Sequence, residues 1–516
     1  MDRAKDHHSQ GSKTTGRRAG GSDFLQLDLR EAPPGSRTER LTARIRSAIA
    51  DGTLPLGSRL PPSRVLAAEL GVSRGVVTEA YQRLADAGQV QGRGRAGTTV
   101  AAAPLPPAAP LFPAVPPAPA SAAPPARLVP APSDEPGEPF RAGAGEALVD
   151  ALRSVPCRID LSPGVPDLTA FPRTAWLQAE RRVLGALTPG DFGYGNPQGA
   201  PALRTAVAGW LARNRGIRAD PGEIVIVAGV AQALALVAYV LREGGVHRVA
   251  VEDPGSLGAR QQLEYGRLET VPVPVDEGGL DTAALRASGA PAVLLTPAHQ
   301  FPTGVVLDGE RRRELLGWAA DGGLVVEDDY DAEHRYDRAP VPALRALLPE
   351  GVCYAGSVSK LLAPALRLGW LLVPPRLRDA VVAAKRYADL GNPVLAQLVL
   401  ARLMDSGELE RHLRHVRRRH RRRRDAMLRA IAAHLPGARV HGAAAGLHLM
   451  VTFDGAAFED TALAARALAL GVKAHPLSWH RVRPGAPGLV LGYAAGPPGE
   501  LEEGIALLGR ARSRLR

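Results

Sequence analysis

A lysine with several polar neighbours follows one of the strand-like runs of this 516-residue chain. In the segment "YAGSVSKLLAPALRLGW", Lys360 stands beside the small hydroxyl residues Ser357 and Ser359, and Arg367 comes seven residues later. A lysine that reacts with a carbonyl group must lose its proton readily, and a pocket can lower its pKa. The two hydroxyls and the guanidinium group suit a phosphate. The segment thus indicates a Schiff-base lysine beside a phosphate site.

Two further segments carry groups that fit the same chemistry. "LVVEDDYD" ends a strand-like run with Asp328 and Tyr330, and Asp328 precedes Lys360 by 32 residues. A carboxylate there can pair with a pyridinium nitrogen, which keeps the ring an electron sink. "AGVAQALAL" places Gly229 and Gln232 at a strand-to-helix turn, where helix N-terminal amides can hold a phosphate. We therefore expect both residues at the cofactor site.

Strand-like and helix-like runs alternate through the part of the chain that holds these residues. The strand-like runs are "EIVIVAG", "HRVAVED", "PAVLLT", "GLVVED", "VCYAGS" and "GWLLV". This alternation predicts an α/β domain with a mostly parallel sheet covered by helices. Residues 409–435 read as one long basic helix. We expect its charges on a solvated or inter-subunit face rather than in contact with DNA.

A glycine-rich stretch near the N-terminus raises a different possibility. In "QGRGRAGTTV", Gly92, Gly94 and Gly97 have the spacing G-x-G-x-x-G of a dinucleotide-binding turn. That motif needs a helix after it and an acidic residue about 20 positions on, whereas a proline-rich stretch follows here. The glycines instead suit the tip of a hairpin that presents Arg93 and Arg95. Such a wing places cations against phosphates or in the minor groove.

Three helices are expected before this hairpin, at 40–52, 61–71 and 72–88, and Ser73 caps the third. The short glycine-containing turn "LGVSR" fits a helix-turn-helix, whose second helix enters the major groove. The residues expected at its exposed N-terminal face are Ser73, Arg74, Thr78 and Gln82. Residues 36–100 hold 10 Lys/Arg and 5 Asp/Glu, a net charge of +5. The alternative is a small helical domain that binds another protein.

The composition limits the other possibilities. The net charge of +12 makes nucleic acid or an anionic surface a plausible partner. The chain has two cysteines without metal-ligand spacing, which fits a reducing cytoplasm and no metal site. No apolar run approaches the 18 residues of a membrane span, and the basic N-terminus is no secretory signal. We therefore expect a cytoplasmic protein.

The N-terminal segment resembles the DNA-binding domain of GntR-type bacterial regulators. The resemblance rests on Gly57 in "PLGSRLPPSR", Arg64, "GVSR" with Arg74, and "AYQRL". It implies that Arg64, Arg74 and the wing glycine region around Gly97 contact DNA. Thr78 stands where some members carry arginine, so their base preference does not transfer to this chain.

From about residue 160 onward the chain resembles fold-type I pyridoxal-phosphate enzymes of the aspartate aminotransferase superfamily. The matching segments are "LSPGVPDLTAFP", "YGNPQGAPALR", "VEDPG", "TPAHQFPTG" and "GLVLGYA". The two domains together resemble MocR-type regulators. This implies Lys360 as the Schiff-base lysine, Asp328 at the pyridine nitrogen, Tyr330 at the phenolic oxygen and Arg367 at the phosphate. It also implies a homodimer in which Tyr194 reaches the neighbouring subunit's site.

The resemblance implies a multidomain chain. We expect a disordered basic tail at 1–35, an α+β winged helix-turn-helix at 36–101, a Pro/Ala-rich linker at 102–156 and an α/β aminotransferase-like domain at 157–516. The predicted function is an operator-binding regulator that senses pyridoxal 5'-phosphate, or its adduct with an amine or amino acid. One alternative is an active aminotransferase with an autoregulatory DNA-binding domain. Another is a regulator whose domain no longer binds the cofactor.

Three departures from the enzyme pattern favour a sensor over an efficient transaminase. Ser256 stands where an aromatic residue usually stacks on the cofactor ring, and Val490 where an arginine usually binds the substrate carboxylate. Without that arginine, an amino acid is less well oriented for proton transfer. Phe301 replaces the asparagine of the usual "NPTG", and His299 and Gln300 are the candidates to substitute for it.

Overall fold

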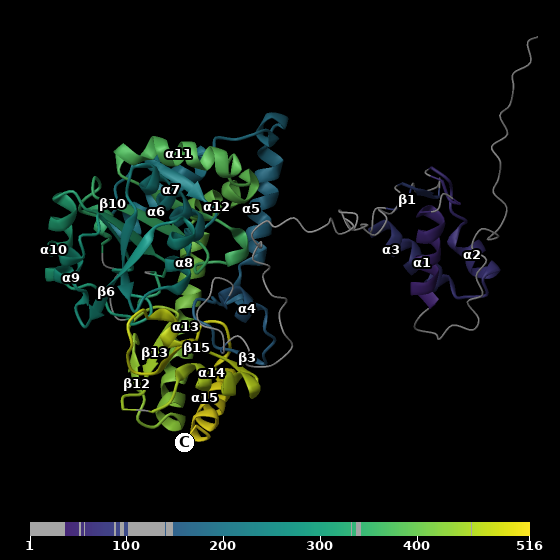
Figure 1. The fold of residues 1–516 in the computed structure, drawn as a ribbon. Helices are drawn as coiled ribbons and strands as arrows, with labels where there is room; N and C mark the ends of the chain where they lie inside the picture. Colours follow the sequence, from purple (N-terminus) through teal and green to yellow (C-terminus); the bar gives the residue numbers. More distant parts are fainter. Residues whose placement is uncertain are drawn as a thin grey trace, which may run out of the picture. The chain divides into compact units, whose positions relative to one another are not determined.

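The computed structural model describes residues 37–50, 53–55, 57–86, 89–92, 97–101, 140, 148–331, 333–336, 342–455 and 457–515. The chain divides into two compact units, Met1–Ala126 and Arg127–Arg516 (Figure 1). No helix among these described residues is long and apolar enough to cross a membrane.

The described part of the N-terminal unit is a helical domain with a two-stranded hairpin. Its elements are α1 (Arg37–Ala50), α2 (Ser63–Glu69), α3 (Arg74–Asp86), β1 (Val90–Gly92) and β2 (Thr98–Val100). The two strands are antiparallel, and Val90 pairs with Val100. The core is apolar and includes Leu41, Ile45, Leu66, Val77, Ala80, Leu84 and both paired valines. The predicted helices and hairpin are confirmed.

An eight-stranded sheet forms the centre of the larger unit. In spatial order its strands are β4 (Ile224–Val227), β11 (Gly369–Leu372), β10 (Val352–Ser357), β9 (Leu324–Asp329), β8 (Ala292–Leu295), β5 (Arg248–Asp253), β6 (Glu269–Asp276) and β7 (Gly279–Leu280). β11 is antiparallel to both of its neighbours, β7 is antiparallel to β6, and the other neighbouring pairs are parallel. The predicted mostly parallel sheet is confirmed.

Helices cover both faces of this sheet because its strands are apolar on both sides. In β4, Ile224 and Ile226 pack in one cluster with α6 and α12, whereas Val225 and Val227 pack in another with α7. The helices of this layer are α5 (Arg173–Ala186), α6 (Pro201–Arg215), α7 (Val230–Glu243), α8 (Leu257–Tyr265), α9 (Thr282–Ser288), α10 (Gly309–Ala320), α11 (Pro375–Asp389) and α12 (Val394–Asp405). Short 3-10 helices are η5 (Leu168–Ala170), η6 (Pro189–Phe192), η7 (Pro221–Glu223), η8 (Leu344–Ala346), η9 (Pro364–Leu366) and η10 (Leu477–His480).

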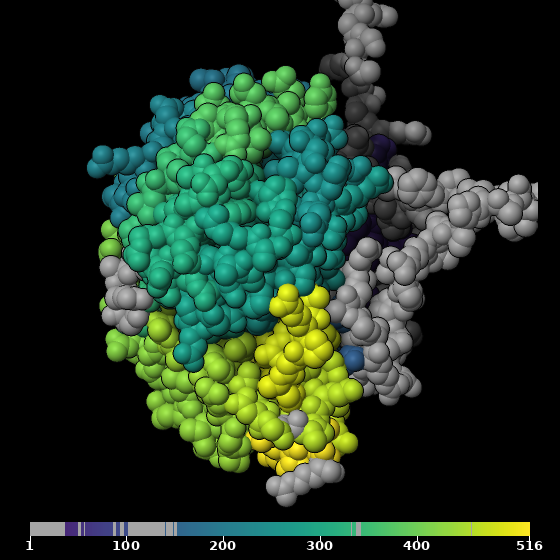
Figure 2. Space-filling view, turned by 60° about the vertical axis from the view of Figure 1, so that its left-hand side comes forward, coloured from purple at the N-terminus to yellow at the C-terminus, as the bar shows by residue number. Residues whose placement is uncertain are grey.

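A smaller layer follows at the C-terminal end of the chain. Its elements are β3 (Ile159–Asp160), β12 (Arg439–His441), β13 (His448–Thr452), α14 (Asp460–Ala469), β14 (Val472–Lys473), β15 (His475–Pro476), β16 (Gly488–Gly492) and α15 (Pro498–Ser513). β12, β13, β16 and β15 form one antiparallel sheet, and β14 pairs with β3. In Figure 2 this layer, in yellow-green to yellow, adjoins the teal central part of the chain on the face shown.

The predicted basic helix is α13 (Glu408–His434), and it joins the two layers. Leu413 and Val416 pack in the core of the sheet layer, whereas Met427 and Ile431 pack in the core of the C-terminal layer. Some of its arginines point inward, in contrast to the solvated or inter-subunit face that we expected. Those of residues 419 and 423 form ion pairs of 2.5 and 3.0 Å with one buried aspartate, at 167.

Folded structure begins before the predicted linker boundary at residue 156. Helix α4 (Leu148–Ser154) lies inside the predicted linker range, and its Leu148 and Leu152 are buried in the core of the C-terminal layer. Phe140 stacks on Trp479, with ring centroids 5.2 Å apart. Proline excludes a helix only where it occurs, and residues 140–155 contain none.

Candidate functional site

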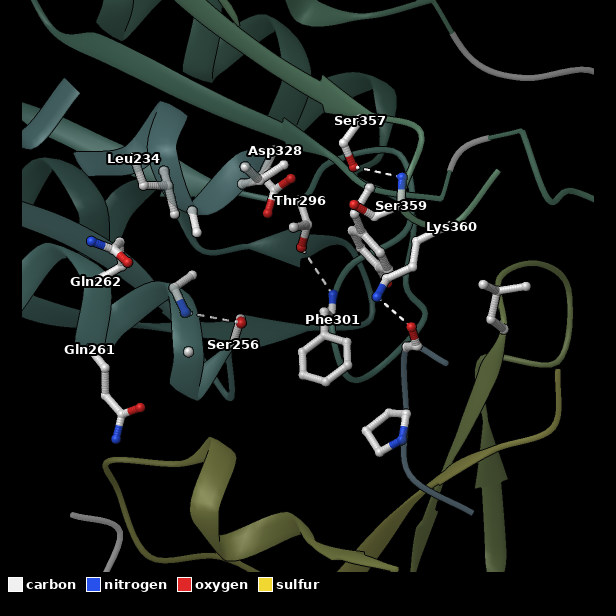
Figure 3. A pocket seen from close by; sticks show the side chains of 18 of the residues that line it. Leu234, Ser256, Gln261, Gln262, Thr296, Phe301, Asp328, Ser357, Ser359 and Lys360 are labelled. Carbon is white, nitrogen blue, oxygen red and sulfur yellow. Dashed lines mark hydrogen bonds between the residues drawn. The ribbon is translucent and has the colours of Figure 1, made fainter. Parts of the chain in front are cut away.

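The polar residues singled out in the larger unit meet in one cavity of about 760 Å³. β4, β9 and β10 run in the same direction, so their carboxyl ends meet at one edge of the sheet, where ligands of α/β proteins usually bind. The predicted residues that line the cavity are Asp328, Tyr330, Ser357, Ser359, Lys360 and Arg367. Figure 3 shows Asp328, Ser357, Ser359 and Lys360 among them.

Lys360 presents its amine inside this cavity. Its Nζ donates a hydrogen bond to the carbonyl oxygen of Gly164, which comes from a segment almost 200 residues away in the sequence. A Cβ atom at Gly164 would lie 3.0 Å from this Nζ, so the glycine leaves room for the amine. Burial is the first cause, and the charge of Arg153 the second, that lowers the pKa of Lys360. A lowered pKa favours the neutral, nucleophilic amine.

Asp328, near the end of β9, carries a buried oxygen without a partner. Its Oδ1 makes no hydrogen bond with any described group. Burial, together with the nearby charges of Asp329 and Asp331, raises the pKa of Asp328 to about 7. A buried carboxylate normally has a hydrogen-bond partner. The protonated nitrogen of a pyridine ring would supply both a donor and a compensating charge, so this position fits the cofactor.

The hydroxyl group of Tyr330 contacts a buried histidine. The Tyr330 hydroxyl lies 3.1 Å from Nδ1 of His299, and the same nitrogen lies 2.9 Å from Oδ2 of Asp331. Burial raises the pKa of Tyr330 above its usual value, so the hydroxyl stays protonated. Asp331 was not singled out from the sequence, although it stands three residues after the end of the predicted strand.

His299, Asp331 and His448 together form a buried group whose possible ligand atoms lie within 4.8 Å of one another. A group of this composition could hold a metal ion, whereas the sequence led us to predict no metal site. Some of these possible ligand atoms already make hydrogen bonds. Nδ1 of His299 pairs with Asp331, and Nε2 of His448 lies 3.2 Å from the carbonyl oxygen of Pro302.

The phosphate end of the cavity combines an arginine with a helix N-terminus. Arg367 donates a hydrogen bond to the carbonyl oxygen of Ala228, at the turn from β4 to α7. Gly229, the N-cap of α7, has a φ of +82°, and a Cβ there would lie 3.3 Å from Nη1 of Arg367. The backbone conformation therefore favours glycine at this position, and a Cβ there would also crowd the guanidinium group of Arg367. Ser357, beside them, accepts a hydrogen bond of 3.3 Å from the amide of Ser359.

Two of the predicted cofactor residues lie elsewhere. Gln232 is outside the cavity lining: its Oε1 accepts from the amide of Ala228, and its Nε2 donates to Asp389, both at 2.7 Å. Gln232 thus fixes the β4–α7 turn. Tyr194 is 94% exposed and lines a separate cavity of about 540 Å³.

The three departures have structural consequences. Ser256 caps α8, because its Oγ accepts a hydrogen bond of 3.3 Å from the amide of Ala259. Val490 is fully buried in an apolar cluster with Met450 and Leu477. Phe301 lines the cavity and packs on the rings of histidines 448 and 480.

Gln300 does not face the cavity. Its amide nitrogen donates to the carbonyl oxygens of Pro254 and Phe301, and its Oε1 accepts from the amide and hydroxyl of Thr303. Neither Gln300 nor the buried His299 lines the cavity in place of the missing asparagine.

The predicted DNA-contacting residues lie on the surface of the N-terminal unit. Arg64, Ser73, Arg74 and Thr78 are all exposed around the α2–α3 turn. Nε of Arg74 donates a long hydrogen bond of 3.4 Å to Oγ of Ser63, which holds the guanidinium group near the start of α3. Gly97 has a φ of +88° in the hairpin. Arg93 and Arg95 lie outside the described residues.

Comparisons with known proteins agree with these two units. The family described as "Aminotransferase class I and II" matches residues 158–506, and "Bacterial regulatory proteins, gntR family" matches residues 37–100. The probable rhizopine catabolism regulatory protein MocR of Rhizobium meliloti is 32% identical over 497 residues, which cover 95% of this chain and 96% of that protein.

The chain belongs to the MocR-type regulators of the GntR family. Another relative is the pyridoxine biosynthesis transcriptional regulator PdxR of Corynebacterium glutamicum, 33% identical over 435 residues, with 83% of this chain and 86% of PdxR covered. MocR-type regulators join a DNA-binding domain to an aminotransferase-like domain. This one is accordingly a transcription regulator.

Solved aminotransferases share the fold of the larger unit of this MocR-type chain. The kynurenine aminotransferase of Pyrococcus horikoshii is 28% identical, with a TM-score of 0.66, and the match covers 73% of this chain and 96% of that enzyme. The α-aminoadipate aminotransferase LysN of Thermus thermophilus is 29% identical, with a TM-score of 0.64 and the same coverage. The cofactor implied for the domain is pyridoxal 5'-phosphate, as the residues of the cavity also indicated.

Proposed function

We propose that this regulator holds pyridoxal 5'-phosphate covalently at Lys360 and senses the cofactor, or its adduct with an amine, to control operator binding. The observation that carries the proposal is the unpaired buried Oδ1 of Asp328 in the same cavity as the lysine amine. In a structural ion pair the Asp328 carboxylate and the Lys360 amine would bind each other. Here the Asp328 oxygen is unpaired, which leaves room for a ligand between the two groups.

Each residue of the cavity has a part in this proposal. Lys360 supplies the nucleophilic amine, and Asp328 holds a proton at the ring nitrogen. Tyr330, whose hydroxyl stays protonated, would donate a hydrogen bond to the phenolic oxygen, in an orientation that His299 maintains. Arg367, with Ser357 and Ser359, binds the phosphate beside the N-terminus of α7. The bound cofactor supplies an aldehyde that can react with amines.

The N-terminal unit binds the operator in this proposal. α3 enters the major groove with Arg74 and Thr78 toward the base edges, while Arg64 and Ser73 contact phosphates. The wing, with Gly97 at its base and Arg93 and Arg95 nearby, meets the backbone or the minor groove. Because its target is operator DNA, the regulator acts in the cytoplasm.

We also propose that the regulator works as a homodimer. Tyr194 and Leu390 line the second cavity and are exposed, and the exposed Phe192 stands between two of its lining residues, Asp191 and Gly193. Exposed apolar side chains of this kind favour a protein partner, and a second copy of the chain fits the shared-site arrangement of the superfamily. Tyr194 would then reach the partner subunit's cavity.

The decisive test uses Lys360→Ala and Lys360→Arg in the full chain. Wild-type protein supplied with pyridoxal 5'-phosphate should absorb near the edge of the visible range, and borohydride should fix an adduct that peptide mass spectrometry locates at residue 360. Both variants should lose the adduct, because neither side chain can form it, while basal operator binding stays within about twofold. If no adduct forms on the wild type, the protein would be a regulator that does not bind the cofactor through Lys360.

Footprinting on the DNA upstream of the gene, with and without pyridoxal 5'-phosphate, tests the sensing step. We expect the footprint of the wild type, but not of Lys360→Ala, to change with the cofactor. Adding an amino acid together with a keto acid to the same preparation, and measuring their turnover, shows whether transamination accompanies sensing. Sustained turnover would favour the active aminotransferase.

A further inference from the structure

A helix that precedes the aminotransferase-like fold brings a cation into the cofactor cavity. Arg153, in the last turn of α4, lines the cavity together with Lys360 and Arg367. These are the positively charged side chains among its described lining residues. In the proposed function Lys360 and Arg367 are occupied by the cofactor's aldehyde and phosphate. The proposed function gives Arg153 no part in cofactor binding.

The backbone position of Arg153 is fixed because residues before and after it in the sequence pack into the core. Leu148 and Leu152 of α4 are buried in the core of the C-terminal layer, and Val155 packs against the same core. Arg153 lines the same cavity as the Lys360 amine, and its charge is one of the causes that lower the pKa of Lys360 and of His475. Its side chain is exposed at the cavity wall.

The usual carboxylate-binding arginine is replaced by Val490, which is buried and apolar. A ligand that reaches the lysine amine with a carboxylate therefore needs another cation. A guanidinium group can bind a carboxylate through two parallel hydrogen bonds. Gln261 and Gln262 of α8 also line the cavity and offer polar side chains to an amino acid.

We propose that Arg153 is the carboxylate-binding residue for the effector, and that the effector is an amine that bears a carboxylate, such as an amino acid. The inference rests on the proposed function, because the amine must react next to Lys360.

Arg153→Gln in the full, cofactor-loaded chain tests the proposal, with Arg158→Gln as the matched control. Arg158 lies five residues further along, is about half exposed, pairs with Glu503 at 2.8 Å and does not line the cavity. The probes are the twenty L-amino acids and the amines that result from their decarboxylation. Binding is followed by the change of the cofactor's absorption band and by the affinity for operator DNA.

We expect the wild type and Arg158→Gln to bind at least one amino acid about tenfold or more tightly than its decarboxylated amine. Cofactor-loaded Arg153→Gln should lose this preference but still bind the amine. In the same variant, the amino acid should no longer change the affinity for operator DNA. A preference retained in Arg153→Gln, or absent from the wild type, would overturn the proposal. A wild type without cofactor at Lys360 would instead refute the proposed function.

Discussion

At the residue scale, the carboxyl group of Asp328 is held where its charge is unfavourable. Burial and the neighbouring Asp329 and Asp331 raise its pKa to about 7, and Oδ1 has no partner among the described groups. The native state therefore keeps a proton between about pH 4 and pH 7 that the unfolded chain has already released. Stability falls as the pH rises through this window, because the native state binds more protons. The cofactor would offset this cost.

Asp328→Asn should stabilise the cofactor-free protein at pH 8 by on the order of 2 kcal/mol, because the charge is removed and the shape is kept. The gain should shrink steadily as the pH falls from 7 toward 4. Thermal unfolding of cofactor-stripped protein at pH 8 and pH 5 measures it. Asp276→Asn is the control: hydrogen bonding to Arg311, at 2.7 Å, lowers the pKa of Asp276 against the cost of burial, so its loss should not stabilise the protein. An equal gain for Asp328→Asn at both pH values would contradict this account.

At the element scale, the amphipathic pattern of α3 determines which residues it can offer to DNA. Val77, Ala80 and Leu84 are buried against the rest of the small domain. The opposite face of the helix therefore points outward, with Arg74 and Thr78 exposed at its N-terminal end. An exposed arginine at the start of a recognition helix suits a bidentate contact to guanine.

Arg74→Ala should cost about 1–3 kcal/mol of affinity for the operator, and much less for unrelated duplex DNA of the same length. Fluorescence anisotropy with both duplexes at one fixed salt concentration gives the two values. Arg83→Ala serves as the control, because Arg83 lies in the last turn of α3, paired with Glu79. If Arg74→Ala binds the operator like the wild type, Arg74 is not at the interface. An equal loss on both duplexes would make it a phosphate contact.

At the scale of the whole molecule, the larger unit exposes aromatic side chains that a monomer would not need. Tyr194 lines the second cavity and is 94% exposed, and Phe192, which stands between the lining residues Asp191 and Gly193, is 61% exposed. Aromatic residues are enriched at the centres of protein interfaces, where they contribute much of the binding free energy. This surface is where we expect the two copies of the chain to meet.

Sedimentation equilibrium should find the wild type as a dimer at micromolar concentration. The double variant Phe192→Ser with Tyr194→Ser should weaken the dimer about tenfold or more, because it removes two apolar anchors. Tyr239→Ser is the control, since Tyr239 is also exposed but does not line the second cavity. A monomeric wild type, or a dimer that the double variant leaves intact, would place the interface elsewhere or exclude it.

The sequence by itself predicted the elements whose signals are local. The strands before Asp328, Ser357 and Gly229 are short apolar runs that end in turn or polar residues, so each could be recognised within ten residues. β6 was not predicted, because its prolines at 272 and 274 lack the amide donors of a regular strand. It is nevertheless part of the sheet, paired with β5 on one side and with the short β7 on the other.

Only the tertiary structure decided which distant side chains share the cavity. Lys360 meets Gly164, and Arg153 joins them from a range assigned to the linker, whereas Gln232 turns toward Asp389 and away from the site. The sequence carries no local mark of these contacts, because they depend on how α4, α7 and the loops before β11 pack. A residue's type and local pattern determine what chemistry it can do. Long-range packing determines whether it is within reach of the reacting group.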